Sequence, residues 1–463
     1  MSDNPNLIWI TLDSLRYDHT SMAGYGRDTT PNLQRIADRS EGRTFSECIA
    51  HGNWTLSSST SILTGTYPSH HTVGLDESTK LTPKLRTVAE LLKERGYATA
   101  CLSDNTHVSD ATGLSRGFDR FSWLSSSTLL ETAGVKSLAK YALNVRKHSA
   151  GFTLDDTKHA TPFLMNEVGT RWLDDLRDEE PFFFYLHYNE PHRPYYPPLP
   201  YLDRYTDDLD VSTEEAAEIS MEVHENLYEI VANGCDLSET EWGALHAMYD
   251  AEIAYTDEMV GRLFDHVRSL DLDDTIFVVT ADHGELFGEY GLLAHKLCLH
   301  DVIINVPLVV HGPTDVTDAD DLVQHADLMR TFVEAAGGST EQLQGVDLRE
   351  EAREHAIAQR GGASFESLLK YNPDFDTDRY HEPMLNCLRT DEFKYQTSGE
   401  RSELFALPDE ETDVRNRHPE TAAALGRRLD EWLETDGQPV DASREAEFTD
   451  AMERQLRDLG YVD

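Results

Sequence analysis

The chain has 463 residues, 39% of them hydrophobic, and its 85 acidic and 40 basic residues give a formal charge of −45 at pH 7. This length is sufficient for one large α/β domain with a smaller domain beside it. A negative field of this size repels phosphate groups, which excludes nucleic acid and acidic membrane surfaces as expected partners.

Lysine is scarce, because only 10 of the 40 basic residues are Lys. Many carboxylates with few lysines predict a halophile's protein from a high-salt cytoplasm, where salt screens the self-repulsion. The five cysteines are scattered without metal-type spacing and indicate reduced thiols. The start "MSDNPNLIWITLDS" has no basic region, and no apolar run approaches membrane-spanning length. We therefore expect a cytoplasmic protein with no membrane span.

Several short, almost unbroken apolar runs predict buried parallel strands. Helical patterns lie between them, such as "TVAELLKERG", in which Thr87 and Glu90 form a capping box. Strands that alternate with helices predict an α/β fold with a mostly parallel sheet covered by helices on both faces. In chain order the predicted strands are 6–13, 98–105, 181–189, 275–284 and 306–313.

Two stretches break this rhythm. Residues 202–240 are strongly acidic and predict a mostly helical insertion within a catalytic domain that spans 1–350. Farther along, "CLRTDEFKYQTSGERSELFALPDEE" predicts short strands joined by polar turns, and "TAAALGRRLDEWLET" predicts a helix. We therefore expect residues 351–463 to form a small α+β C-terminal domain.

Polar residues follow three of the predicted strands, at the sheet edge where ligands gather in parallel folds. Asp13 closes the first strand, His192 follows the third, and Asp282 and His283 close the fourth. A carboxylate and an Asp-His pair that converge from separate strands would make a divalent metal site. Each residue also has a plainer interpretation, because an Asp at a strand end is commonly a cap or turn former.

The stretch "NWTLSSSTSILTGTYP", residues 53–68, predicts a helix from Leu56 to Leu63 that is stopped by Gly65. Thr55 would then place its hydroxyl at a helix N-terminus, where unpaired N–H groups favour an anion. Coordination to a metal opposite would lower the hydroxyl pKa and make this oxygen a nucleophile. The alternative is that Thr55 is an ordinary N-cap residue.

Together these blocks resemble the sulfatase branch of the alkaline phosphatase superfamily. The resemblance covers most of the chain in the expected order and implies an alkaline phosphatase-like sheet with a small C-terminal domain. It also implies metal-dependent hydrolysis of a sulfate or phosphate ester of a small molecule or glycan. The matching blocks are "LIWITLDSLRYDHTSMAGYGRDTTPNLQRIA", "SILTGTYPSHHTVG", "ERGYATA", "GFDRF", "PFFFYLHYNEPHRPYYPP", "VVTADHGELFGEYGLLAHK", "NVPLVVHGP" and "LRTDEFKYQTSGERSELFAL".

Carried over residue by residue, the resemblance implies one divalent metal held by Asp13, Asp282 and His283, with Thr55 facing it as the nucleophile. His192, in "PHRP", matches a position that holds the transferred group.

Further along the chain, His295 or Lys296, in "LLAHK", matches a position that assists the leaving oxygen. Lys296 is one of only ten lysines, which favours a specific role over a solvated surface charge. Asn105, at the end of the second predicted strand, and His107, just beyond it, are expected to line the substrate pocket.

The chain departs from the best-known sulfatases at the nucleophile. Those enzymes carry Cys-x-Pro-x-Arg, whose first residue matures to formylglycine, whereas here Thr55, Ser57 and Ser59 occupy the Cys, Pro and Arg positions. No formylglycine is therefore expected. A threonine ester must be cleaved by attack at sulfur or phosphorus, and family members that keep Thr here are phosphoryl-type hydrolases and transferases.

Ser14 stands where calcium-type sulfatases often place a second acidic ligand, and His283 stands where they often have Asn. This ligand set favours Mn²⁺ or Zn²⁺, with Ca²⁺ as the alternative. The leading prediction is a hydrolase with a covalent Thr55 ester. The alternatives are a phosphoryl-group transferase on the same scaffold and an inactive anion-binding homologue. The sequence does not specify the substrate or the oligomeric state.

Overall fold

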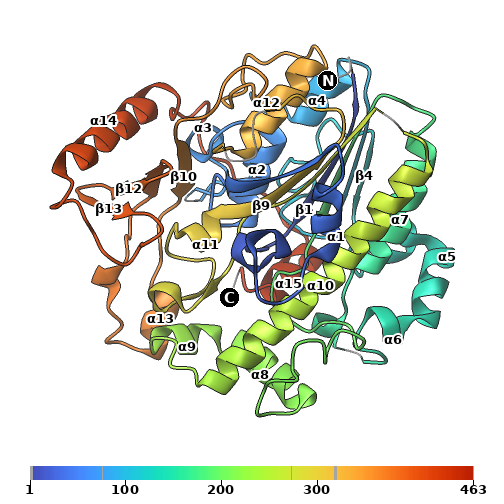
Figure 1. The fold of residues 1–463 in the computed structure, drawn as a ribbon, viewed down its shortest axis with the longest axis horizontal. Coiled ribbons are helices and arrows are strands. Elements are labelled where there is room, and N and C mark those ends of the chain that lie inside the picture. The colour runs from blue at the N-terminus through green and yellow to red at the C-terminus, as the bar shows by residue number, and fades with distance from the viewer. Residues whose placement is uncertain (1–3, 76, 154, 273, 317–320, 462–463) are drawn as a thin grey trace.

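The computed structural model describes residues 4–75, 77–153, 155–272, 274–316 and 321–461. Its centre is a seven-stranded sheet in which β1 pairs in parallel with β5 and β6 (Figure 1). This arrangement confirms the predicted mostly parallel sheet. In spatial order the strands are β2 (Gly42–Ile49), β9 (Asn305–His311), β6 (Thr275–Ala281), β1 (Asn6–Leu12), β5 (Phe182–Tyr188), β3 (Ala98–Ser103) and β4 (Arg120–Trp123).

The prediction of a parallel strand at 306–313 is wrong in direction. The strand exists as β9, but it runs antiparallel to both β6 and β2. The apolar run "VPLVVH" reports burial on both faces and carries no information on direction. A parallel return would need a crossover helix, whereas the link from β6 to β9 holds only α11 (Asp301–Ile304), η4 (Glu289–Gly291) and two-residue strands.

Helices cover the sheet in two layers, as the alternating pattern predicted (Figure 1). In one layer α2 packs on α4 and α12, and in the other α10 packs on α1, α7 and α8. The predicted capping box of Thr87 and Glu90 begins α4. The helices are α1 (Pro31–Ala37), α2 (Thr55–Thr64), α4 (Val88–Lys93), α7 (Pro162–Leu176), α8 (Thr213–Glu225), α10 (Glu239–Ser269) and α12 (His325–Ala335).

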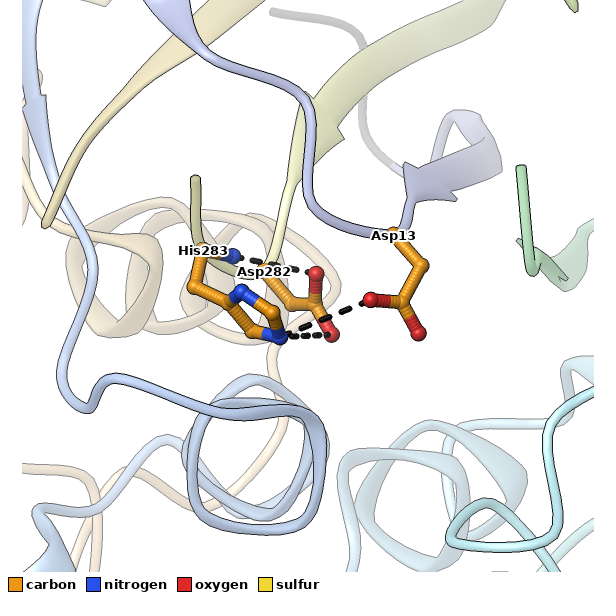
Figure 2. A group of neighbouring side chains, drawn as sticks. All are labelled: Asp13, Asp282 and His283. Carbon is orange, nitrogen blue, oxygen red and sulfur yellow. Dashed lines mark hydrogen bonds and ion pairs between the residues drawn. The ribbon is translucent and has the colours of Figure 1, made fainter. Parts of the chain in front are cut away.

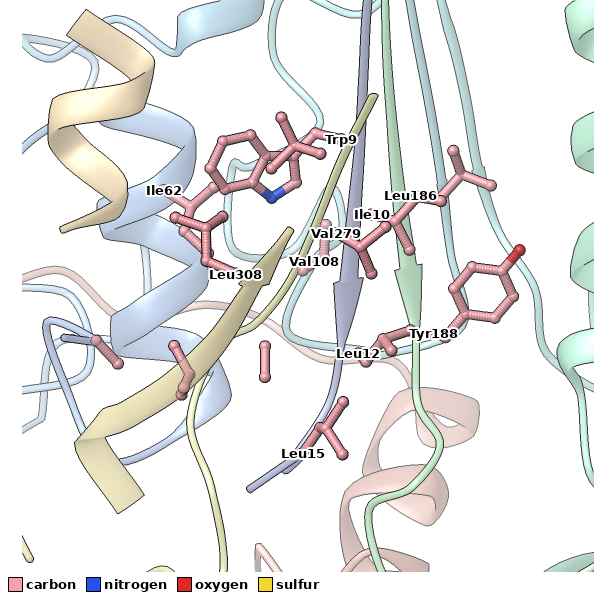
Figure 3. Packing of buried hydrophobic residues seen from close by; sticks show 14 of the residues in the cluster. Trp9, Ile10, Leu12, Leu15, Ile62, Val108, Leu186, Tyr188, Val279 and Leu308 are labelled. Carbon is pink, nitrogen blue, oxygen red and sulfur yellow. The ribbon is translucent and has the colours of Figure 1, made fainter. Parts of the chain in front are cut away.

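The core fixes the ends of the central strands. Buried side chains of β1 alternate between the two faces of the sheet, so that Trp9 and Ile10 belong to opposite sides of one continuous cluster (Figure 3). Within this packing Leu12 of β1 pairs in register with Ala281 of β6. The residues that follow this pair, Asp13 and Asp282, therefore leave the sheet side by side.

The acidic stretch 202–240 is largely helical. It holds α8 and α9 (Leu227–Ala232), and α10 begins at Glu239. Its role as an insertion within a 1–350 catalytic domain stays a prediction. No helix within the described ranges combines the length and apolar character that a bilayer crossing requires.

A second, antiparallel sheet of four strands carries α14 (Pro419–Thr435) and forms the predicted C-terminal α+β unit. The chain then leaves this unit, because α15 (Asp450–Asp458) lies apart from α14 and against the loop that follows β3 (Figure 1). The strands of the second sheet are β10 (Ala356–Arg360), β11 (Leu385–Arg389), β12 (Phe393–Ser398) and β13 (Arg401–Ala406).

Candidate active site

A buried group of two carboxylates and one imidazole lies at the ends of β1 and β6 (Figure 2). Asp13 comes from β1, Asp282 and His283 come from β6, and one ligand atom of each lies within 4.8 Å of the others. All three side chains are 0% exposed. The parallel register that pairs these strands brings the predicted metal ligands together.

The hydrogen bonds of this group fit a bound cation. His283 Nδ1 lies 2.8 Å from the Gly284 carbonyl oxygen, which can only accept, so Nδ1 carries the hydrogen and Nε2 keeps a lone pair. That Nε2 lies 3.4 Å from Asp13 Oδ1 and 3.9 Å from Asp282 Oδ2 (Figure 2). Asp282 Oδ2 is buried without a hydrogen-bond partner. Three acceptor atoms that face one another in a buried site are stabilised by a positive ion.

The pKa shifts of these three residues also fit a bound cation. Burial and the neighbouring charge of Asp13 raise the pKa of Asp282 to about 6. Burial disfavours charged His283, but the two carboxylates outweigh that effect and raise its pKa above the ordinary value. Burial opposes the ionisation of Asp13, yet the imidazoles of His192, His187 and His283 keep its pKa well below the usual range. The raised pKa values of Asp282 and His283 indicate a group that favours an added positive charge.

Metal binding is therefore expected to weaken in acid. Groups with raised pKa values take up protons at higher pH, and a cation must displace those protons to bind. The Kd for Mn²⁺ should be lowest above neutral pH and rise about tenfold per pH unit, for each displaced proton, as the pH falls through about 6. Calorimetry between pH 8 and pH 5, with circular dichroism as the control for unfolding, measures this. A Kd that is constant across that range would contradict the assignment of these ligands.

Thr55 is the first residue of α2, and its hydroxyl faces Asp13 and His283. Thr55 Oγ1 lies 3.1 Å from Asp13 Oδ2 and 3.4 Å from His283 Nε2. The N-cap position belongs to Trp54, and no side-chain capping bond is made there, so Thr55 does not act as an ordinary cap. Gly65 ends the helix in the left-handed conformation, at φ 64°, as predicted.

Asn105 and His187 hold Asp13 in place. Asn105 Nδ2 donates to Asp13 Oδ2 at 2.8 Å and to Asn189 Oδ1 at 3.2 Å. His187 Nε2 lies 3.3 Å from the same Asp13 oxygen. The sequence analysis missed His187, because it stands inside the apolar run of β5, where a histidine carries no signal of its own.

His192 and His295 lie next to each other, with ring centroids 5.5 Å apart. In each ring Nδ1 faces a backbone carbonyl oxygen, that of Arg193 at 2.8 Å and that of Asn53 at 3.0 Å. The hydrogen is therefore on Nδ1, and Nε2 is left as an acceptor. Burial lowers the pKa of His192 to about 3 and that of His295 well below its ordinary value. Both rings therefore favour the neutral form, and each presents Nε2 as a hydrogen-bond acceptor.

Lys296 and His107 flank the site on two sides. Lys296 Nζ donates to the Tyr228 hydroxyl at 2.6 Å and to the Gly460 carbonyl at 3.2 Å. His107 has no hydrogen-bond partner on either ring nitrogen and packs edge-on against Trp54, with centroids 5.2 Å apart.

Tyr461, which the sequence analysis did not single out, reaches into the centre of the site. Its hydroxyl lies 2.7 Å from Thr55 Oγ1 and 3.3 Å from His192 Nε2. The ending "LGYVD" holds no motif, so only the path of the chain after α14 reveals this contact.

A mostly parallel sheet with an Asp, an Asp-His pair and a helix-start hydroxyl at its strand ends defines an ester hydrolase of the alkaline phosphatase superfamily type. The chain belongs to the sulfatase family, whose family model, described as "Sulfatase", matches residues 5–339.

Curated relatives are distant. The N-acetylglucosamine-6-O-sulfatase of Bacteroides thetaiotaomicron is 24% identical over 424 residues, covering 74% of this chain and 70% of that one. The multifunctional alkaline phosphatase superfamily protein PehA of Trinickia caryophylli is 25% identical over 393 residues, covering 72% and 74%. The crystal structure of the phosphonate monoester hydrolase of Agrobacterium radiobacter matches with a TM-score of 0.69 and 21% identity, covering 93% of this chain and 95% of that one. That likeness supports the fold.

Proposed function

We propose that this protein hydrolyses a sulfate or phosphate ester through a covalent ester on Thr55. The observation that carries the proposal is the Thr55 hydroxyl, which stands at the start of α2 and 3.1 Å from Asp13 Oδ2 instead of capping its helix. Ser57 and Ser59 follow it, both buried without hydrogen-bond partners for their hydroxyl groups. Since the formylglycine motif is absent, the unmodified threonine is the nucleophile.

Asp13, Asp282 and His283 would hold one divalent ion, for which Mn²⁺ or Zn²⁺ is favoured and Ca²⁺ is the alternative. When bound, such an ion supplies Lewis-acid stabilisation of negative charge on the transferred group. The residues around it supply the remaining steps.

In the first half of the reaction, Thr55 Oγ1 forms a bond to sulfur or phosphorus while the bond from that atom to the ester oxygen breaks. The Thr55 proton passes to Asp13 Oδ2, which accepts a hydrogen bond from the Thr55 hydroxyl at 3.1 Å. The leaving oxygen takes a proton from the Lys296 ammonium group, because His295 is neutral and has no proton on Nε2.

In the second half, water attacks the sulfur or phosphorus of the Thr55 ester and gives its proton to His295 Nε2, a buried acceptor without a hydrogen-bond partner. The bond from that atom to Thr55 Oγ1 breaks, and the oxygen recovers its proton from Asp13. Proton transfer from His295 to Lys296 restores the starting state. His192 would contact the transferred group through Nε2, which lies 3.3 Å from the Tyr461 hydroxyl.

The alcohol half of the substrate would occupy a cavity of about 530 Å³ beside the site. The cavity shares Trp54, His295, Lys296 and Tyr461 with the site, so it begins where the leaving oxygen departs. Its size suits a small-molecule group, and its aliphatic wall favours an aryl or alkyl alcohol over a sugar. That part of the wall consists of Leu227, Val231, Leu292, Leu293, Leu297 and Leu368.

A panel of matched esters in molar KCl tests this function: aryl sulfate, aryl phosphate monoester, aryl phosphodiester and glucosamine 6-sulfate. We expect Thr55-dependent release of the phenol with kcat/KM about tenfold or more above that for the sugar ester. Preference for the sugar ester would contradict the assignment of the cavity. Product that forms only with an added alcohol acceptor would identify the transferase, and tight anion binding without turnover would identify an inactive homologue.

The molar salt in this assay follows from the charge of −45 and the few lysines, which we interpret as adaptation to a high-salt cytoplasm. The salt dependence of the melting temperature tests this interpretation. Added salt should screen the self-repulsion of the carboxylates and so raise the melting temperature.

A further inference from the structure

The segment from Thr449 to Tyr461 is anchored beside the site by α15. The Thr449 side chain caps the helix by accepting from the Met452 amide, and Met452, Leu456 and Leu459 are buried. This anchoring places the end of α15 at the mouth of the site.

Gln455 ties α15 to the loop after β3 and to the end of β4 (Arg120–Trp123). Its Nε2 donates to the Asp104 carbonyl at 2.6 Å, and its Oε1 accepts from Trp123 Nε1 at 3.1 Å. The helix is therefore docked on the catalytic sheet, independently of the residues that follow it.

The two residues after Leu459 enter the site. Gly460 adopts φ +74° and turns the chain inward, and its carbonyl accepts from Lys296 Nζ at 3.2 Å. The Tyr461 ring stacks on His192 with centroids 5.4 Å apart and meets His107 edge-on at 4.7 Å. Its hydroxyl bonds Thr55 Oγ1 at 2.7 Å.

We propose that Gly460 and Tyr461 occupy the substrate position and close the site. An anionic substrate must displace these two residues in order to bind. The inference rests on the proposed function, because it takes Thr55, His192 and Lys296 as the groups that contact the substrate. A reacting sulfur or phosphorus atom must approach to about 3 Å from the nucleophile. The Tyr461 hydroxyl fills that space, so the phenol and the substrate anion exclude each other.

The chemistry of the surroundings favours exchange of the phenol for an anion. Arg193 is 5% exposed, and its Nε and Nη2 atoms have no hydrogen-bond partner. A Cβ added to Gly460 would lie 2.6 Å from Arg193 Nη2, so this guanidinium borders the inserted backbone. The neutral Tyr461 phenol and the Gly460 carbonyl pair with the Arg193 and Lys296 cations less well than a sulfate or phosphate group would. Opening would release the Gly460 and Tyr461 amides from the Arg457 and Leu456 carbonyl oxygens, each 2.8 Å away, while α15 keeps its own anchors.

The test compares Tyr461→Ala and Tyr461→Phe with Glu453→Gln, a change on the exposed side of α15. The probe is inorganic phosphate with saturating Mn²⁺, titrated by calorimetry. We expect Tyr461→Ala to lower the Kd for phosphate about tenfold, with a matching fall in KM for the best ester of the panel, and Tyr461→Phe to shift both constants in the same direction. Glu453→Gln should match the wild type. Because phosphate binding needs no turnover, the result is readable even if Thr55 proves dispensable.

A hydrogen-exchange measurement on the unmodified chain gives a second readout. Phosphate with Mn²⁺ should speed exchange at Gly460 and Tyr461 while α15 keeps its protection. Either a fall in kcat for Tyr461→Ala with phosphate affinity unchanged, or slower exchange at these two amides on phosphate binding, would overturn the proposal. The first result would make Tyr461 part of the catalytic machinery, and the second would mean that phosphate holds the segment in place instead of displacing it.

Discussion

Replacing Thr55 with alanine is expected to lower kcat/KM by about 10⁴-fold or more, since loss of a covalent nucleophile removes the bond-forming group itself. Thr55→Ser should retain measurable activity, because it keeps an oxygen 3.1 Å from Asp13 Oδ2. Ser57→Ala is the matched control on the same helix: it removes a buried hydroxyl without a partner and should leave the rate unchanged. Steady-state kinetics on the best ester of the panel gives all three values.

Full activity in Thr55→Ala would contradict covalent catalysis by this residue. Equal losses in Thr55→Ala and Ser57→Ala would show that disturbance of α2, and not chemistry at Thr55, causes the effect. Melting temperatures of the variants separate these cases, because α2 is buried along its whole length.

Removing the metal or one of its ligands should have the second large effect. Dialysis against a chelator is expected to abolish turnover, and Mn²⁺ or Zn²⁺ should restore it. Asp282→Asn should weaken metal binding by at least about 100-fold, because even residues that only orient a metal ligand contribute 10–100-fold. The control is Asp265→Asn, whose carboxylate makes an exposed ion pair with Arg35. Undiminished turnover after chelation, with metal content checked by mass spectrometry, would contradict the metal assignment.

Much of the candidate site could be predicted from the sequence, because the proposed metal ligands follow buried strands. Apolar runs located β1 and β6, and parallel pairing then required Asp13 and Asp282 to leave the sheet together. The helix that begins at Thr55 was predictable for a similar reason, since Gly65 marks where α2 ends. Strand ends and helix ends are local features with local residue preferences.

Features set by the tertiary path of the chain were not predictable. The direction of β9 depends on the short link that precedes it, and the apolar run itself is compatible with either direction. His187 looks like any residue of a buried strand until its neighbour Asp13 is placed at 3.3 Å. Tyr461 reaches Thr55 across 406 positions of sequence, and no periodic pattern encodes that return.

The most direct test of the central claim is to trap the covalent ester. The chain would be mixed with excess aryl ester and Mn²⁺, quenched in acid within one turnover, digested and analysed by tandem mass spectrometry. The account predicts a peptide heavier by one sulfuryl or phosphoryl group, with the added mass on Thr55, absent from Thr55→Ala and unchanged in Ser57→Ala. Turnover without any such adduct, or an adduct on another residue, would contradict it.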